Sequence, residues 1–121
     1  MILTIYIAEP HYDNRMRLMA HAEKIDRGAA VEPLCEIGFE NMAQFGELFT
    51  PKRWELVESL RAAGPLSIYA LAKRLNRHYR NVYKDVAALM EWLVIEKDEA
   101  DKVFVPWDEI AVRWPLLKQA A

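Results

Sequence analysis

Residues 64–94 constrain the fold of this chain most, because they read as two helices joined by a tight turn. Apolar residues recur at helical spacing on both sides of Asn76, and asparagine suits a turn because it tolerates left-handed backbone angles. We expect a first helix that begins after the N-cap residue Ser67, and a second helix over about 77–91. A short helix, a short turn and a second helix that opens with basic and polar residues are typical of a helix-turn-helix that reads DNA.

Charge is distributed unevenly along the chain. No carboxylate occurs between Glu58 and Asp85, whereas six basic residues fall there: Arg61, Lys73, Arg74, Arg77, Arg80 and Lys84. Residues 1–49 hold four basic and eight acidic side chains, and residues 50–121 hold twelve and ten, so the formal net charge of -2 conceals a local basic excess. Because a phosphate backbone responds to local charge, the second part of the chain is the candidate for nucleic-acid binding.

Three helices and a hairpin are predicted for residues 50–121. Thr50, followed by a proline, marks the start of the first helix. Two short apolar runs on either side of the polar residues 98–101 predict a β-hairpin. Three helices followed by a hairpin form a winged helix-turn-helix domain, against which the tail is expected to pack through Trp107 and Trp114.

The first 49 residues read as a strand, a helix and a second strand, so the fold class is α+β with a small β-α-β extension before the winged helix. The strands are expected over 1–8 and about 31–39, the helix over 13–27, and a short helix over 41–48. This unit is too small to form a good core alone. It packs onto its own winged helix, joins two chains, or binds another protein, and the sequence leaves these alternatives open.

Helical geometry divides the second helix of the helix-turn-helix between the core and solvent. At about 100° per residue, Val82, Val86 and Leu89 share the buried face. Arginine suits the O6 and N7 atoms of guanine, and asparagine suits adenine, in the major groove. The candidate base-reading residues on the exposed face are therefore Arg77, Arg80, Asn81 and Lys84.

A second set of residues is expected to contact phosphates, which gives affinity without sequence information. These candidates are Lys52, Ser67, Lys73, Arg74, Tyr83 and Lys102. Lys102 is the only basic candidate at the hairpin tip, where Asp98, Glu99 and Asp101 repel phosphates and argue against deep insertion into the minor groove. Basic residues on a helix are also common on a merely solvated face, and winged helices also serve as protein-contact modules.

Four segments resemble the small predicted winged-helix transcriptional regulators of bacteria and archaea, which are related in fold to the multiple-antibiotic-resistance (MarR-like) regulators. These segments are 48–61, 64–75, 79–89 and 105–110, and the resemblance covers about 39–110. The Asn-Val-Tyr-Lys-Asp-Val motif at 81–86 is moderately specific, and the other segments are generic for winged helices. The resemblance implies a DNA-binding regulator, commonly dimeric, with some relatives encoded beside toxin-like genes. Trp92 departs from the family, which usually has glycine there, and tryptophan does not easily adopt a left-handed helix cap.

No enzymatic site is expected in this sequence. His11, His21, His78 and Cys35 lack a recognisable metal-ligand spacing, and Cys35 reads as an inert thiol on an apolar strand face. Glycine-rich phosphate loops and catalytic triads are absent, so we expect no cofactor. A single cysteine, no long apolar run and no signal-peptide features predict a cytoplasmic protein without a membrane segment.

Together these features predict a sequence-specific, double-stranded DNA-binding transcriptional regulator. We expect a dimeric repressor that reads the major groove with residues 77–92. Its expected partners are double-stranded DNA and a second copy of the chain, and a co-encoded toxin-like protein is a further candidate. The alternative is a protein-interaction module, such as an antitoxin-like protein that binds its partner.

Overall fold

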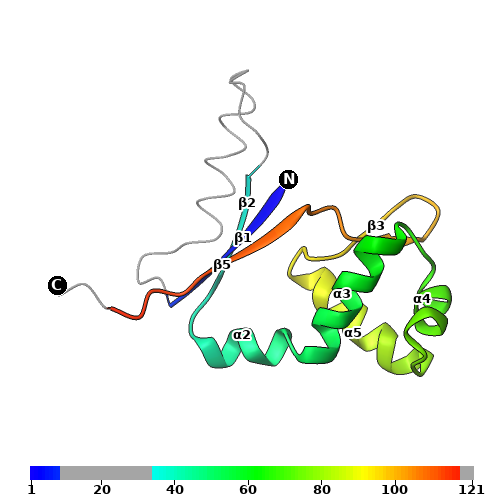
Figure 1. The fold of residues 1–121 in the computed structure, drawn as a ribbon, viewed down its shortest axis with the longest axis horizontal. Helices are drawn as coiled ribbons and strands as arrows, with labels where there is room; N and C mark the ends of the chain where they lie inside the picture. Colours follow the sequence, from blue (N-terminus) through cyan, green and yellow to red (C-terminus); the bar gives the residue numbers. More distant parts are fainter. Residues whose placement is uncertain (9–33, 118–121) are drawn as a thin grey trace, which may run out of the picture. The chain divides into compact units, whose positions relative to one another are not determined.

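The computed structural model describes residues 1–8 and 34–117, which form an α+β arrangement (Figure 1). The predicted helix over 13–27 lies outside the described residues. In chain order, the described elements are β1 (Ile2–Ile7), β2 (Leu34–Phe39), α2 (Met42–Leu48), α3 (Pro51–Ala63), α4 (Ile68–Leu75), α5 (Tyr79–Glu91), β3 (Glu96–Lys97), β4 (Val103–Phe104) and β5 (Glu109–Arg113). Within the described ranges, no helix has the length and apolar character needed to cross a membrane.

The chain separates into two compact units. Unit 1 draws on residues 1–45 and 107–121, and unit 2 comprises residues 46–106. This division differs from the predicted one, 1–49 and 50–121, because the segment after Pro106 belongs with the first unit rather than with the helices. The reason is β5, a strand that the sequence analysis did not predict and that pairs with β1.

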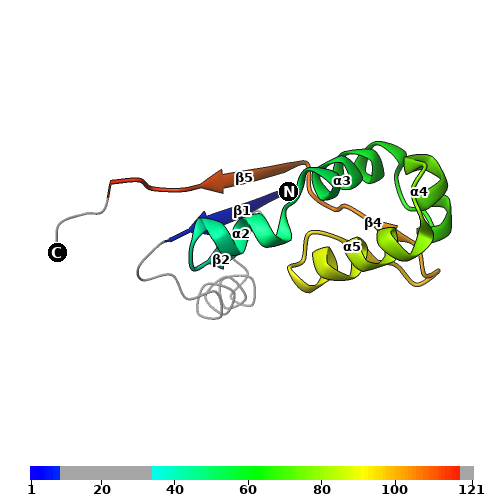
Figure 2. The same ribbon diagram turned by 90° about the horizontal axis from the view of Figure 1, so that it is seen from below.

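Unit 1 is built on a parallel three-stranded sheet in the order β2-β1-β5 (Figures 1 and 2). In the central strand, Leu3, Ile5 and Ile7 are fully buried, whereas the residues between them are partly exposed. This alternation confirms the predicted first strand. Buried residues of β2 share its apolar face, and Cys35 lies on that face as predicted but is only half-buried.

Two tryptophans were expected to anchor the tail on the hairpin domain. Trp107 is buried, at 7% exposure, but it belongs to unit 1. Trp114 is 47% exposed, so its predicted role as an anchor is wrong. The tail instead contributes a strand: the amide of Asp108 donates to the carbonyl of Met1 at 2.9 Å, and the β1–β5 ladder begins at the next residue. Parallel pairing between distant segments leaves little local signal.

In unit 2, α3 begins where the sequence predicts, after Thr50, and it ends at a glycine. The hydroxyl of Thr50 accepts a hydrogen bond from the amide of Arg53 at 3.3 Å, and Pro51 occupies the first turn. The helix ends at Gly64, whose φ of 84° needs glycine and whose amide donates to the carbonyl of Leu60 at 3.0 Å. Buried Leu60 lies on the face that packs into the core.

The helices α4 and α5 end in the same hydrogen-bonded motif. After α4, Asn76 is left-handed with a φ of 53°, and its amide bonds the carbonyl of Lys73 while the next amide bonds that of Ala72. After α5, Leu93 takes the left-handed position with a φ of 65°, and the same two bonds recur. Trp92 keeps a φ of -102°, so the left-handed cap that it cannot easily adopt is moved to the following residue.

The predicted hairpin forms from β3 and β4, which pair antiparallel. Asp98 shapes its turn, because its carboxylate accepts bonds from the amides of Ala100 and Lys102 at 2.9 and 3.0 Å. Val103 also bridges to Leu66 in the loop before α4, with amide-to-carbonyl bonds in both directions at 3.0 and 2.8 Å. Unit 2 therefore has the predicted order of three helices followed by a hairpin, and the hairpin is attached to the link between the first two helices.

Candidate nucleic-acid interface

The link between α4 and α5 consists of Asn76, Arg77 and His78. The second helix was expected to begin at residue 77, but α5 begins at Tyr79, with His78 as an N-cap that makes no side-chain capping bond. Arg77 consequently belongs to the turn, where its amide closes the end of α4 on the carbonyl of Ala72 at 3.0 Å. Its side chain is directed by the turn and not by the periodicity of α5.

Arg77 does not lie on the exposed face that was predicted for it. Its side chain is only 17% exposed, and Nη2 donates to Oδ2 of Asp85 at 2.7 Å. Nη1 is buried and has no hydrogen-bond partner among the described residues. The prediction that Arg77 lies on the exposed face of the helix is therefore wrong, because its guanidinium pairs with the largely buried Asp85 of α5.

Arg53, which the sequence analysis missed, completes this cluster. Its Nε donates to Oδ1 of Asp85 at 3.0 Å, and its Nη1 donates to the carbonyls of Leu48 and Glu47 at 2.9 and 3.3 Å. Asp85 is 14% exposed and uses both oxygens, one for each arginine. The Arg53–Asp85–Arg77 cluster thus ties the end of α2, the start of α3 and the turn to α5. The available signal was Asp85 itself, the carboxylate that ends an otherwise basic stretch of the sequence, because a largely buried charge needs a partner.

The other three base-reading candidates lie where helical periodicity predicts. Arg80, Asn81 and Lys84 are exposed on α5. The opposite face of the helix is buried, with Val82 and Leu89 at 0% exposure. The predicted exposure of the three is confirmed, and their role in reading bases stays a prediction. All three fall in the amino-terminal half of α5, the part that contacts base edges in helix-turn-helix proteins.

Basic side chains on α4 are arranged by neighbouring polar and aromatic groups. Nζ of Lys73 lies 5.0 Å from the centroid of the Tyr69 ring, a cation–π distance. Nε of Arg74 donates to the hydroxyl of Ser59 on α3 at 2.9 Å. Both charged residues are exposed, so each charge is oriented by a neighbour and still accessible to a phosphate.

The remaining phosphate candidates are spread along unit 2. Lys52 is exposed in the first turn of α3, and Ser67 caps α4 by accepting from the amide of Ala70 at 3.1 Å. The Ser67 hydroxyl proton is still available for donation to a phosphate oxygen. Lys102 is exposed at the hairpin turn, and Tyr83 is 52% exposed on α5. Their individual exposure is established, and a shared ligand for all of them stays a prediction.

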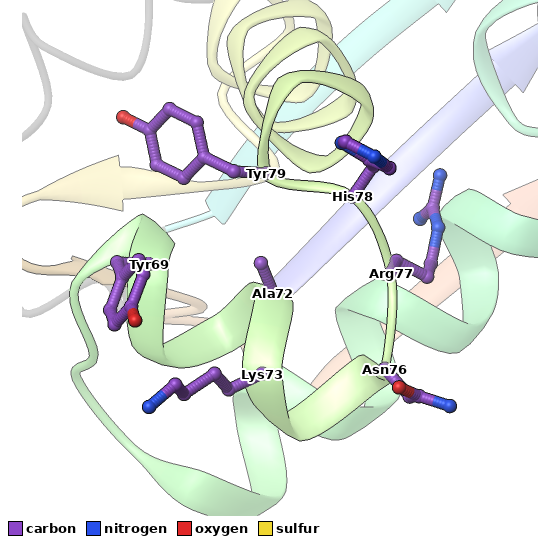
Figure 3. Close-up of a pocket in the computed structure, with 7 residues that line it drawn as sticks. All are labelled: Tyr69, Ala72, Lys73, Asn76, Arg77, His78 and Tyr79. Carbon is purple, nitrogen blue, oxygen red and sulfur yellow. The ribbon is translucent and has the colours of Figure 1, made fainter.

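Exposed tyrosines accompany the basic residues of α4 and α5. Tyr69, Tyr79 and Tyr83 are 61%, 48% and 52% exposed, and the rings of Tyr79 and Tyr83 lie 6.1 Å apart. An open depression of about 490 Å³ lies between α4 and the start of α5. Figure 3 shows Tyr69 and Lys73 on one side of it and Tyr79 on the other, while the side chains of Asn76 and Arg77 point away from the tyrosines. The surface thus combines cations with aromatic rings and phenolic hydroxyls.

Residues 48–112, more than half of the chain, match the HVO_A0114 family. The chain belongs to the HVO_A0114 family. No curated protein and no solved structure matches the chain significantly. The predicted relation to winged-helix transcriptional regulators stays a prediction, because the family match adds no statement about DNA.

The HVO_A0114 match spans the whole candidate interface. It begins at the end of α2 and ends within β5, so it contains the Arg53–Asp85–Arg77 cluster and the exposed residues of α5. The HVO_A0114 match also extends beyond unit 2 into the strand that pairs with β1. Among the described residues, no three His, Cys, Asp or Glu side chains gather as a metal site.

Proposed function

We propose that this HVO_A0114 family member is a sequence-specific, double-stranded DNA-binding transcriptional regulator, and that it acts as a homodimeric repressor. In this proposal unit 2 is a winged helix-turn-helix, in which α5 is the recognition helix and the β3–β4 hairpin is the wing. The observation that carries the proposal is the exposed face of α5, where Arg80, Asn81 and Lys84 stand opposite the buried residues. We further propose that it works in the cytoplasm, without a cofactor and without enzymatic activity.

The charge of the region supports binding to a polyanion. Asp85 is the first carboxylate after Glu58, and it is neutralised by two arginines. The Arg53–Asp85–Arg77 cluster therefore keeps one positive charge in excess, while the basic side chains of α4 and α5 remain outside it. The stretch between Glu58 and Glu91 therefore offers cations to a duplex and holds no carboxylate without an ion-pair partner.

The proposed division of labour follows the chemistry of each side chain. Arg80 reads guanine and Asn81 reads adenine through paired hydrogen bonds in the major groove. Lys73 and Arg74, oriented by Tyr69 and Ser59 respectively, bind phosphates and set the register on the duplex. The tyrosine hydroxyls of the same surface are additional phosphate donors.

The hairpin has a minor part in this proposal. Its tip carries Asp98, Glu99 and Asp101, and Nζ of Lys97 is already paired with Asp101 at 3.4 Å. Acidic tips repel phosphates, so α5 carries the sequence readout and the wing contributes at most through Lys102.

Fluorescence anisotropy tests the proposal with duplex DNA from upstream of the protein's own gene and with a scrambled duplex, each at two salt concentrations. We expect tighter binding to the upstream duplex and weaker binding to both at high salt. Asn81→Ala relaxes the sequence preference and costs about 1–3 kcal/mol on the specific duplex. Lys73→Ala weakens binding to both duplexes alike and reduces the salt slope by about one unit.

The acidic hairpin supplies a control for these binding measurements. Lys97→Ala is a matched control, because it removes an exposed lysine that is paired on the acidic hairpin. Its binding curves should overlay those of the unaltered protein. Absence of binding to either duplex at low salt contradicts the proposal. Unchanged binding by both Asn81→Ala and Lys73→Ala contradicts the assignment of base reading to α5 and of phosphate contacts to α4.

A second candidate function, a protein-interaction module of the antitoxin-like kind, is favoured by the exposed tyrosines. Tyrosine is enriched in protein interfaces, and Tyr69, Tyr79 and Tyr83 are exposed on adjoining elements. This function predicts a stable complex with a co-encoded protein and no salt-sensitive binding to duplex DNA. Tyr69→Ala would then weaken that complex, whereas in the DNA proposal Tyr69 orients Lys73 and donates to a phosphate, so the same substitution would weaken duplex binding.

A further inference from the structure

The outer edge of β5 is an open edge of the parallel sheet in unit 1. The strand order is β2-β1-β5, so within the described residues β5 pairs on one side only, with β1. Exposed apolar side chains occur on β5 and in the segment directly after it: Val112 at 45%, Trp114 at 47%, Leu116 at 75% and Leu117 at 91%. An unpaired edge with apolar side chains is a template for another strand.

The two faces of β5 differ in character. The parallel register places Ile110 and Val112 beside Leu3 and Ile5, on the face that forms the core. Leu3 and Ile5 are fully buried, but Val112 is exposed. The apolar face is therefore accessible to solvent where it reaches β5. The opposite face carries a charge of each sign at the two ends of the strand, Glu109 and Arg113, with Ala111 between them. Neither charged side chain has an ion-pair partner within the described ranges.

We propose that β5 strands of two copies of this chain pair antiparallel about a two-fold axis at Ala111, joining two three-stranded sheets into one of six strands. In this register Glu109 lies opposite Arg113 of the second copy, and the same contact is repeated by symmetry. Ile110 lies opposite Val112 of the second copy, on the face of the core. A two-fold interface requires a self-complementary surface, and the β5 sequence is self-complementary in both charge and apolar character.

Other registers lose this match. A two-fold axis at Ile110 or at Val112 leaves Glu109 or Arg113 opposite Ala111 of the second copy, with no opposite charge. A shift by a single residue would set the apolar face of one sheet against the charged face of the other, because strand side chains alternate with a period of two. The register centred on Ala111 is thus the one that continues the apolar face and pairs both charges.

This inference rests on the dimer of the proposed function, but it does not rest on DNA binding. The pairing uses residues of unit 1, whereas the candidate DNA contacts belong to unit 2. An oligomer measured without DNA therefore tests the β5 edge, and duplex binding tests α5.

The test is sedimentation velocity with the full chain, without DNA, over a range of concentrations. We expect a dimer for the unaltered protein. Glu109→Arg and Arg113→Glu each place two pairs of like charges across the interface, so the dimer Kd of each rises at least about tenfold. An equimolar mixture of these two variants restores a dimer, because every pair across a mixed interface is again of opposite charge.

Matched variants keep the test decisive. The double variant Glu109→Arg/Arg113→Glu should dimerise like the unaltered protein, and Arg113→Lys should retain the dimer because it keeps the charge. Circular dichroism checks that each variant is folded, which is expected because both side chains are exposed. A monomer at every concentration overturns the inference, as does a dimer that is insensitive to both charge reversals. A chain that is monomeric until a co-encoded protein is added also overturns it, since the edge then takes a different occupant.

The two proposals fail separately. Loss of the dimer with retained duplex binding in anisotropy overturns only the pairing of β5. A dimer that responds to charge reversal but binds no duplex overturns only the DNA-binding function.

Discussion

The two units of this chain use charged side chains in opposite ways. In unit 2, Asp85 is satisfied within the chain by Arg53 and Arg77, and the three side chains are only 14–20% exposed. In unit 1, Glu109 and Arg113 stand exposed on an edge strand without ion-pair partners among the described residues. The ion pairs of the Arg53–Asp85–Arg77 cluster fix the geometry of the helices that carry them. Exposed charges without partners in the part of the chain that the structure describes, such as those of Glu109 and Arg113, can instead pair with another molecule. The difference separates residues that build the fold from residues that are available for binding.

The largest effect is expected from breaking the closed cluster. Asp85→Ala leaves two largely buried guanidinium groups without a counter-ion and should reduce the free energy of unfolding by about 2–4 kcal/mol. Urea unfolding followed by circular dichroism measures this change. Glu91→Ala is a matched control, because it removes an exposed carboxylate from the same helix and should change stability by less than about 0.5 kcal/mol. Equal losses for the two variants would contradict the role of the cluster.

A smaller effect of opposite sign is expected at the end of α5. Leu93→Gly relieves a left-handed residue with a φ of 65° and should stabilise the protein by up to about 1 kcal/mol, less any lost packing of the leucine. Thermal unfolding measures the gain. Trp92→Gly is the matched control, because the φ of -102° at Trp92 needs no glycine and its substitution should only destabilise. A gain from the Trp92 variant instead would mean that the left-handed cap is misplaced.

The smallest effect on folding is expected at the open edge. Arg113→Ala, measured at a concentration where the chain is monomeric, should change the free energy of unfolding by less than about 0.5 kcal/mol. Arg53→Ala under the same conditions should cost more, because it removes one counter-ion of Asp85 and its bonds to the end of α2. Comparable losses of unfolding free energy for the two variants would contradict the distinction between the paired charges of unit 2 and the exposed charges of β5.

Part of the candidate interface was predictable, because helical periodicity depends only on sequence spacing. It assigned Val82, Val86 and Leu89 to the core, and it assigned Arg80, Asn81 and Lys84 to solvent, as the structure has them. The same geometry failed for Arg77, because this residue precedes α5 and its long side chain follows the turn. Arg53 could not be found by spacing, since its partner lies 32 residues away on another helix.

The amino-acid sequence by itself determined where α3 and α4 begin and end, because caps act between neighbours. Thr50 and Ser67 accept bonds from amides three residues later, and Gly64 and Asn76 adopt the backbone angles that suit their side chains.

Only the tertiary structure decided which distant segments meet. The tail becomes β5 because β1 offers it a strand to pair with, more than 100 residues earlier in the chain. The burial of Arg77 was likewise decided by its pairing with Asp85 on the following helix. Caps and periodicity are local and are written in adjacent residues, whereas strand partners and ion pairs depend on which surfaces the folded chain brings together.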